Sequence, residues 1–182
     1  MKAIILTAIA ACSLAIPASY AVEPCSGQGC CSVKSNPVLP GFHADPEVLY
    51  AEQTGKYYIC SPSDGTPGWG GYYFHVFSSP DLKSWTDEGI MLDLKSDQVP
   101  WATGNAWAPA IIERKEADGY KYYFYYSGHS KEADTKQIGV AVADNPVGPF
   151  RDLGHPIVTK SPAGHGQQID VDVFADPVSG KH

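Results

Sequence analysis

The chain has 182 residues, of which 43% are hydrophobic and 18% charged, and its formal net charge is −7 at pH 7. This balance is typical of a folded chain, and Gly and Pro together stay below the share found in low-complexity proteins. The acidic charge and the absence of clustered Lys and Arg exclude a nucleic-acid partner, because phosphate binding needs such clusters. After the N-terminus no apolar run is long enough for a membrane span.

Residues 1–21 are typical of a secretory signal peptide. Lys2 supplies the positive start, residues 3–16 are apolar, and small residues end at Ala21, where cleavage is expected. The sequence therefore predicts a secreted or periplasmic protein. A lesser alternative stays open, because Ile9-Ala10-Ala11-Cys12 resembles a bacterial lipobox, which would anchor the protein through a lipid on Cys12.

Residues 22–35 form a leader rich in Cys, Gly and Ser. Cleavage after Ala21 leaves four cysteines, and an oxidising compartment favours disulfides among them, with a free or intermolecular thiol as the alternative. Their spacing lacks the second half of a zinc site. The four are Cys25, Cys30, Cys31 and Cys60.

Residues 36–182 show a repeat of about sixty-three residues, which is typical of propellers and solenoids. Turn signals divide the first copy into four short strands, predicted at 47–51, 56–62, 72–79 and 85–90. The second copy predicts strands at 110–114, 121–126, 138–143 and 150–153 in the same order.

A third copy opens near residue 167, with a turn expected at Asp176-Pro177. Four antiparallel strands per repeat predict an all-β propeller, with a β-sandwich as the main rival. Residues 36–182 hold only about two and a third repeats, so we expect them to be part of a larger ring, the first two blades and the start of the third.

Two aspartates occupy equivalent positions in the repeat, at the start of the first strand. Asp45 precedes Pro46 in the first copy, and Asp170 opens the third. The first strand of each blade lines the channel of a propeller, so both carboxylates are expected to converge there. Such convergence suits glycoside hydrolysis. The structural alternative is that Asp45 only forms a turn with Pro46.

Three ordered motifs, NPVLPGFHADPEV, WAPAII and QQIDVDVFADPVSGK, resemble glycoside hydrolase family 43 from residue 36 to residue 182. The resemblance implies a five-bladed propeller enzyme that inverts configuration while cleaving arabinose-, xylose- or galactose-containing poly- or oligosaccharides. It implies that Asp45 is the general base and that Asp170 orients the acid and tunes its pKa. Trp107 and Ala108 would line the sugar site.

The family's general acid, a Glu of the fourth blade, has no counterpart up to His182. No cofactor is evident, and a central metal ion in the complete ring is left open. Two alternatives to an enzyme therefore remain: a propeller that binds glycans without cleaving them, and a nonfunctional gene fragment.

Other polar and aromatic residues near these motifs have two possible roles each. Asn105 and Gln168 could bond sugar hydroxyls, and His43 could contact sugar or stabilise a turn. Trp69 and Trp101 could each offer a platform for a sugar ring or pack locally. Glu47 and Glu113 are expected to be solvated, and His165 is expected on a loop surface.

Overall fold

The computed structural model describes residues 30–32, 36–65, 67–161, 164 and 166–181. The predicted signal peptide with Cys12, most of the leader, His165 and His182 lie outside these residues. Within the described part of the chain, no helix is long and apolar enough to cross a membrane.

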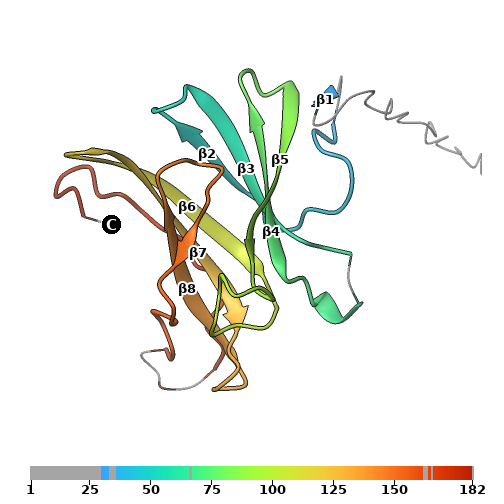
Figure 1. Cartoon of the computed structure of the whole chain (residues 1–182), viewed down its shortest axis with the longest axis vertical. Helices are drawn as coiled ribbons and strands as arrows, with labels where there is room; N and C mark the ends of the chain where they lie inside the picture. The colour runs from blue at the N-terminus through green and yellow to red at the C-terminus, as the bar shows by residue number, and fades with distance from the viewer. Residues whose placement is uncertain (1–29, 33–35, 66, 162–163, 165, 182) are drawn as a thin grey trace, which may run out of the picture.

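Two antiparallel sheets make up the fold, as the prediction required (Figure 1). The first has the order β1-β5-β4-β3-β2 and the second the order β6-β7-β8-β9. The strands of the first sheet are β1 (Cys30–Ser32), β2 (Glu47–Ala51), β3 (Lys56–Pro62), β4 (Tyr73–Ser79) and β5 (Ser84–Asp93). The strands of the second are β6 (Trp107–Glu116), β7 (Gly119–His129), β8 (Lys136–Ala143) and β9 (Arg151–Asp152), and a short 3-10 helix, η1 (Pro67–Trp69), lies between β3 and β4.

Each predicted strand in the two complete repeats is confirmed, with differences at the ends. β5, β6 and β7 are longer than expected, because the β4–β5 and β6–β7 pairings continue past the predicted ends. A register shift between Trp107 and Ala110 lets β6 begin before the predicted residue 110. β9 is shorter and pairs with β8 only at Arg151 and Asp152.

The third repeat departs further from the prediction. Residues 167–176 carry no strand, because a strand requires a continuous ladder and this segment makes isolated backbone bonds. One of these runs from the Gln168 N–H to the Lys136 carbonyl, at 3.0 Å. The expected turn is present at residues 177–179, closed by the Gly180 N–H on the Asp176 carbonyl at 2.8 Å.

The main core is an aromatic layer between the two sheets. Tyr122, Phe124 and Tyr126 alternate along β7, so all three side chains leave the same face of the strand, and all are buried. Phe74 of β4 meets the Phe124 ring edge-on, with ring centroids 5.0 Å apart, and lies 5.6 Å from Tyr126. A smaller cluster covers the other face of the first sheet, formed by Leu39, Ile59, Phe77 and Trp85.

Cys60 is a buried free thiol in the core between the sheets, so the disulfide expected to involve it is wrong. Its position on β3 turns the side chain into the interior. Burial, followed by the nearby Glu47 carboxylate, raises the pKa of the thiol. Cys25 lies outside the described residues, as do the side chains of Cys30 and Cys31.

We expect Phe74→Ala to lower the free energy of unfolding of the full-length protein by about 3–5 kcal/mol, because it opens a cavity in the aromatic layer. Chemical denaturation monitored by circular dichroism measures this loss. Leu82→Ala, at an exposed turn, is the matched control and should change stability by less than about 0.5 kcal/mol. Equal effects of the two variants would contradict the packing role of Phe74.

Candidate active site

The candidate site lies where β2 of the first sheet and β6 of the second sheet begin. β2 and β3 both contact β6, and the β3–β4 connection meets the start of β6 through the Ala106 N–H, which donates to the Gly71 carbonyl at 2.9 Å. The start of β2 lies at the same end, because Glu47 pairs with Cys60 near the end of β3. Asp45 and Trp107 therefore belong to one end of the sheet pair.

Asp170 is brought to this end by β7. Its backbone N–H donates to the Ser127 hydroxyl at 3.3 Å, and Ser127 is the strand partner of Trp107. Asp45 comes from the segment before β2, where the N–H of its neighbour Ala44 donates to the Asp64 carboxylate. Both predicted carboxylates are exposed to solvent. The structure thus places Asp170 beside Trp107. It also ties the backbone next to Asp45 to the β3–β4 loop.

The carbonyl oxygen of Trp69 joins the two blades at the site. It accepts the Trp107 indole N–H at 2.6 Å and the Asn105 side-chain amide at 3.3 Å. The Lys136 ammonium lies 4.6 Å from the centre of the Trp107 ring, a cation–π contact. The indole predicted to line the sugar site is therefore held in place on two sides.

Lys136 also holds the segment that leads to Asp170. Its ammonium donates to the Gln167 side-chain oxygen at 2.6 Å, and the Gln168 side-chain amide donates to the Gly166 carbonyl at 3.1 Å, within its own loop. The Gln168 amide thus shapes the loop before Asp170.

Residues of the candidate site share an unusual backbone. Positive φ angles occur at Asp45 (45°), Trp69 (61°), Asn105 (51°), Ala108 (34°) and Asp170 (59°). Side chains with a Cβ rarely adopt this left-handed region, and such strain concentrates at functional sites. Among the described residues other than glycine, only Leu82 and Asp134 also have positive φ. Three of these residues, Asp45, Ala108 and Asp170, are ones that the repeat or the resemblance singles out.

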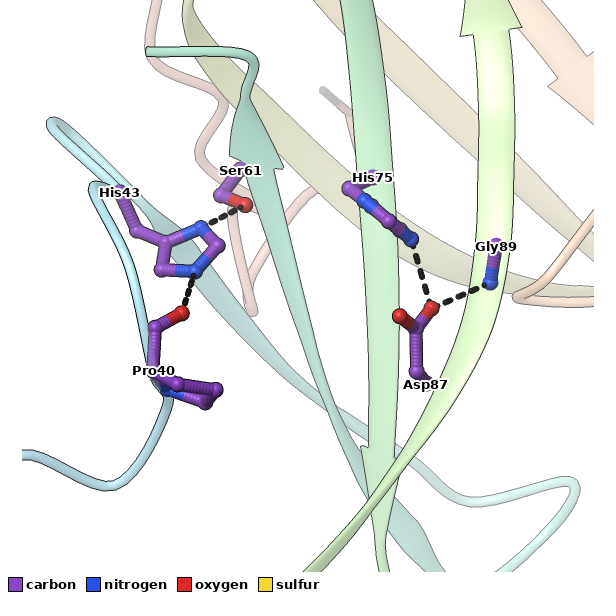
Figure 2. Close-up of polar contacts among 6 residues, drawn as sticks. All are labelled: Pro40, His43, Ser61, His75, Asp87 and Gly89. Carbon is purple, nitrogen blue, oxygen red and sulfur yellow. Dashed lines mark hydrogen bonds and ion pairs between the residues drawn. The ribbon is translucent and has the colours of Figure 1, made fainter. Parts of the chain in front are cut away.

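His43 stabilises the turn before Asp45. Figure 2 shows its ring between β3 and the preceding segment, with Nδ1 3.0 Å from the Ser61 hydroxyl and Nε2 2.9 Å from the Pro40 carbonyl. The His43 ring also packs edge-on against Phe77, with centroids 5.3 Å apart. Both ring nitrogens are engaged, which favours the turn-stabilising role over a sugar contact.

A cavity of about 510 Å³ opens beside the segment that carries Asp45. The β3–β4 loop and residues 41–44 line it, with Phe42, Ala44, Asp64 and Trp69 among the lining residues. Its size is within the range of small-ligand sites. Trp101 lies elsewhere: it is buried and stacks on Tyr126 with centroids 5.9 Å apart, so its role is packing.

Two carboxylates that were expected to be solvated are not: Glu113 accepts hydrogen bonds and Glu47 is half-buried. Glu113 of β6 accepts the backbone N–H groups of Glu52 and Gln53 at 2.8 and 3.3 Å, and it accepts the Tyr122 hydroxyl. Glu47 is half-buried, and burial followed by the charge of Asp172 raises the pKa of its carboxyl. Sequence reasoning missed both, because the backbone N–H groups that bind Glu113 and the Asp172 charge near Glu47 come from other repeats.

No group of three or more His, Cys, Asp or Glu side chains that could hold a metal ion is found in the part of the chain that the structure describes. The described residues therefore include no set of ligands for a central metal ion.

Two blade-like antiparallel sheets, with the start of a third repeat placed against them, make the chain part of a β-propeller. The model of Glycosyl hydrolases family 43 matches residues 34–182. The chain belongs to this family, and its sheets match part of the family's five-bladed propeller.

Relatives and solved structures agree with this family. The chain is 36% identical over 153 residues to a beta-D-galactofuranosidase of Aspergillus niger, covering 78% of this chain and 41% of that protein. It is 40% identical over 106 residues to a xylosidase/arabinosidase of Humicola insolens, covering 57% of this chain and 28% of that protein. The crystal structure of a family 43 arabinoxylan arabinofuranohydrolase from Bacillus subtilis matches with a TM-score of 0.61 and 29% identity, over 78% of this chain and 32% of that one. The chain thus spans about two fifths or less of these relatives.

We expect Glu47→Gln to make the protein more stable at neutral pH. Because the pKa of Glu47 is raised above its ordinary value of 4.5 in the folded state, the folded chain binds the proton more tightly than the unfolded chain. The stability that this gives is present below pH 4.5 and is lost as the pH rises through the folded-state pKa. The glutamine cannot ionise, so this loss should disappear from urea-unfolding free energies measured between pH 4 and pH 8. Glu132→Gln, at an exposed position, is the control and should leave the pH dependence of the unfolding free energy as in the wild type. If Glu47→Gln also leaves this pH dependence unchanged, Glu47 does not contribute to it.

Proposed function

We propose that the protein is an inverting glycosidase that acts on arabinose-, xylose- or galactose-containing glycans, with Asp45 as general base. The observation that supports this most directly is that Trp107 lies at the same end of the sheet pair as Asp45 and Asp170, both of which have positive φ. The names of the relatives, a galactofuranosidase and a xylosidase/arabinosidase, support the substrate class.

The proposed reaction is a single displacement at the anomeric carbon. The ionised Asp45 carboxylate takes a proton from a water molecule as that water attacks, while a carboxylic acid on the other side of the sugar protonates the departing oxygen. The two groups must stand roughly 6.5–9.5 Å apart to leave room for the water. In this proposal Asp45 is the base, and no described residue is assigned as the acid.

Asp170 is proposed to act on that acid. A negative charge near a carboxyl group disfavours its ionisation, so Asp170 would keep the acid protonated at the working pH. The contact of its backbone N–H with Ser127 would hold this charge beside the sugar site. Trp107 would form one wall of that site, since its ring is fixed by Trp69 and Lys136.

We expect Asp45→Asn to abolish glycoside hydrolysis by the full-length protein while leaving the fold intact. The amide keeps the shape of the carboxylate but cannot accept the proton of the water, so the rate should fall by about 10²–10⁴-fold or more. NMR of the first-formed anomer checks the stereochemistry in the wild type. Net retention of configuration would overturn the assignment of Asp45 as the base.

Asp170→Asn should lower activity through the acid. Removing the nearby negative charge lets the acid ionise at lower pH, and each pKa unit corresponds to about 1.4 kcal/mol between protonation states. The alkaline limb of the pH–rate profile should therefore move to lower pH. Activated aryl glycosides, whose leaving group needs little protonation, should be hurt less than natural linkages.

Asp172→Asn is the matched control, since it neutralises a carboxylate two residues away, and its alkaline limb should stay in place. If Asp170→Asn instead shows an unchanged pH profile and equal losses on both kinds of substrate, Asp170 has only a structural role.

A further inference from the structure

The segment before Asp45 is connected to the end of β3 at two points. The Nδ1 atom of His43 lies 3.0 Å from the Ser61 hydroxyl (Figure 2), and the Ala44 N–H donates to the Asp64 carboxylate. After Asp45 the chain enters β2, which pairs with β3 along its length. The backbone of Asp45, whose φ is 45°, is therefore held by β3 on both sides.

The two polar contacts of the His43 ring determine which ring nitrogen carries the proton. The Pro40 carbonyl oxygen lies 2.9 Å from Nε2 and can only accept a hydrogen bond, so the proton is assigned to Nε2. In the neutral ring Nδ1 then has a lone pair, and the Ser61 hydroxyl donates to it. Ser61 is fully buried, and a buried hydroxyl requires such a partner. His43 thus pairs with the Ser61 hydroxyl while it closes the turn that begins at Pro40.

The His43 ring is also fixed by aromatic packing. It meets Phe77 of β4 edge-on, with ring centroids 5.3 Å apart, and Phe77 in turn stacks on His75 with centroids 4.9 Å apart. The His75 Nε2 lies 2.6 Å from the Asp87 carboxylate, which also accepts the Gly89 N–H at 2.8 Å (Figure 2). Two hydrogen bonds and one ring contact hold the His43 imidazole, so both of its nitrogens are used within the fold.

We propose that His43 is a positioning residue for Asp45, which it holds in place by binding the preceding turn to the buried hydroxyl of Ser61. This inference rests on the proposed function. A general base must lie within hydrogen-bond reach of the proton that it removes, and a misplacement of about 1 Å can lower a rate about 100-fold. Because the base acts on the attacking water, a displaced Asp45 lowers kcat more than it weakens binding of the sugar.

The test uses the full-length protein, the single variants His43→Phe and Ser61→Ala, and the double variant. The phenylalanine keeps a ring against Phe77 and removes both hydrogen bonds of the histidine. His75→Phe is the matched control. It also removes a histidine hydrogen bond beside Phe77, at a position outside the segment that carries Asp45.

We expect His43→Phe to lower kcat on a glycan substrate of the wild type about tenfold to 100-fold, with KM changed less than about twofold. Ser61→Ala should lower kcat as well. The double variant should lose no more than His43→Phe alone, since both substitutions remove the same hydrogen bond. His75→Phe should keep the kcat of the wild type.

Four results would overturn the proposal while leaving the proposed function standing. An unchanged kcat in either single variant removes the role of the His43–Ser61 hydrogen bond. Losses that add in the double variant mean that the two side chains act independently. A rise in KM as large as the fall in kcat places His43 in sugar binding, and an equal fall of kcat in His75→Phe makes the effect unspecific.

The ring itself gives a test that needs no substrate. At about pH 8, where an ordinary histidine is neutral, ¹⁵N NMR of the histidine-labelled wild type should show the proton of His43 on Nε2 and none on Nδ1. The signals are assigned by their loss in His43→Phe. A proton on Nδ1 overturns the proposal, because Ser61 would then not donate to the ring.

If the wild type cleaves no glycan, the proposed function fails and hydrogen exchange at the Ala44 amide decides whether His43 holds the segment. Faster exchange in His43→Phe than in the wild type and in His75→Phe supports the proposal, since the bond from Ala44 to Asp64 lies next to His43. Equal exchange in all three proteins overturns it.

Discussion

The burial of one face of each blade against its neighbour is the constraint on which the rest of the structure depends. Strand side chains alternate, so an antiparallel blade with apolar residues on both faces must be covered on both. Phe74, Phe124 and Tyr126 provide this cover between the two blades. Polar contacts fix each end of the layer: the Glu113 carboxylate holds the β2–β3 turn at one end, and the Trp69 carbonyl holds the start of β6 at the other.

This arrangement explains why the strained residues lie together. A left-handed residue costs about 1–3 kcal/mol, and it persists where the surrounding structure determines the path of the chain. Asp45 and Asp170 are placed in this way, by the Ala44–Asp64 bond and by the Ser127 hydroxyl. The aromatic layer stabilises the blades, and the blades in turn hold the carboxylates in a conformation that an isolated segment would leave.

Much of the fold could be predicted because it is local and repeated. Tyr-rich runs, turn signals and the repeat gave the strands β2–β4 and β6–β8 within a few residues, and the equivalence of Asp45 with Asp170 follows from the same repeat. What the sequence did not reveal depends on contacts between repeats. The sequence around Glu113 predicts an exposed side chain, because it does not show that the β2–β3 turn binds this carboxylate. Likewise, nothing in the sequence around Cys60 indicates that its side chain points into the core.

The proposed sugar site and the β3–β4 loop beside it depend on different kinds of contact. The proposed sugar site consists of Trp107 at the start of β6 and of the two aspartates Asp45 and Asp170. The β3–β4 loop meets the start of β6 through main-chain oxygens, those of Trp69 and Gly71, and it meets the segment before Asp45 through the Asp64 carboxylate. A carbonyl oxygen is present whatever the side chain, so the loop can change the aromatic surface it presents without losing these contacts. The side chains of this loop can therefore change while its main-chain contacts to β6 and the packing between the blades stay as they are.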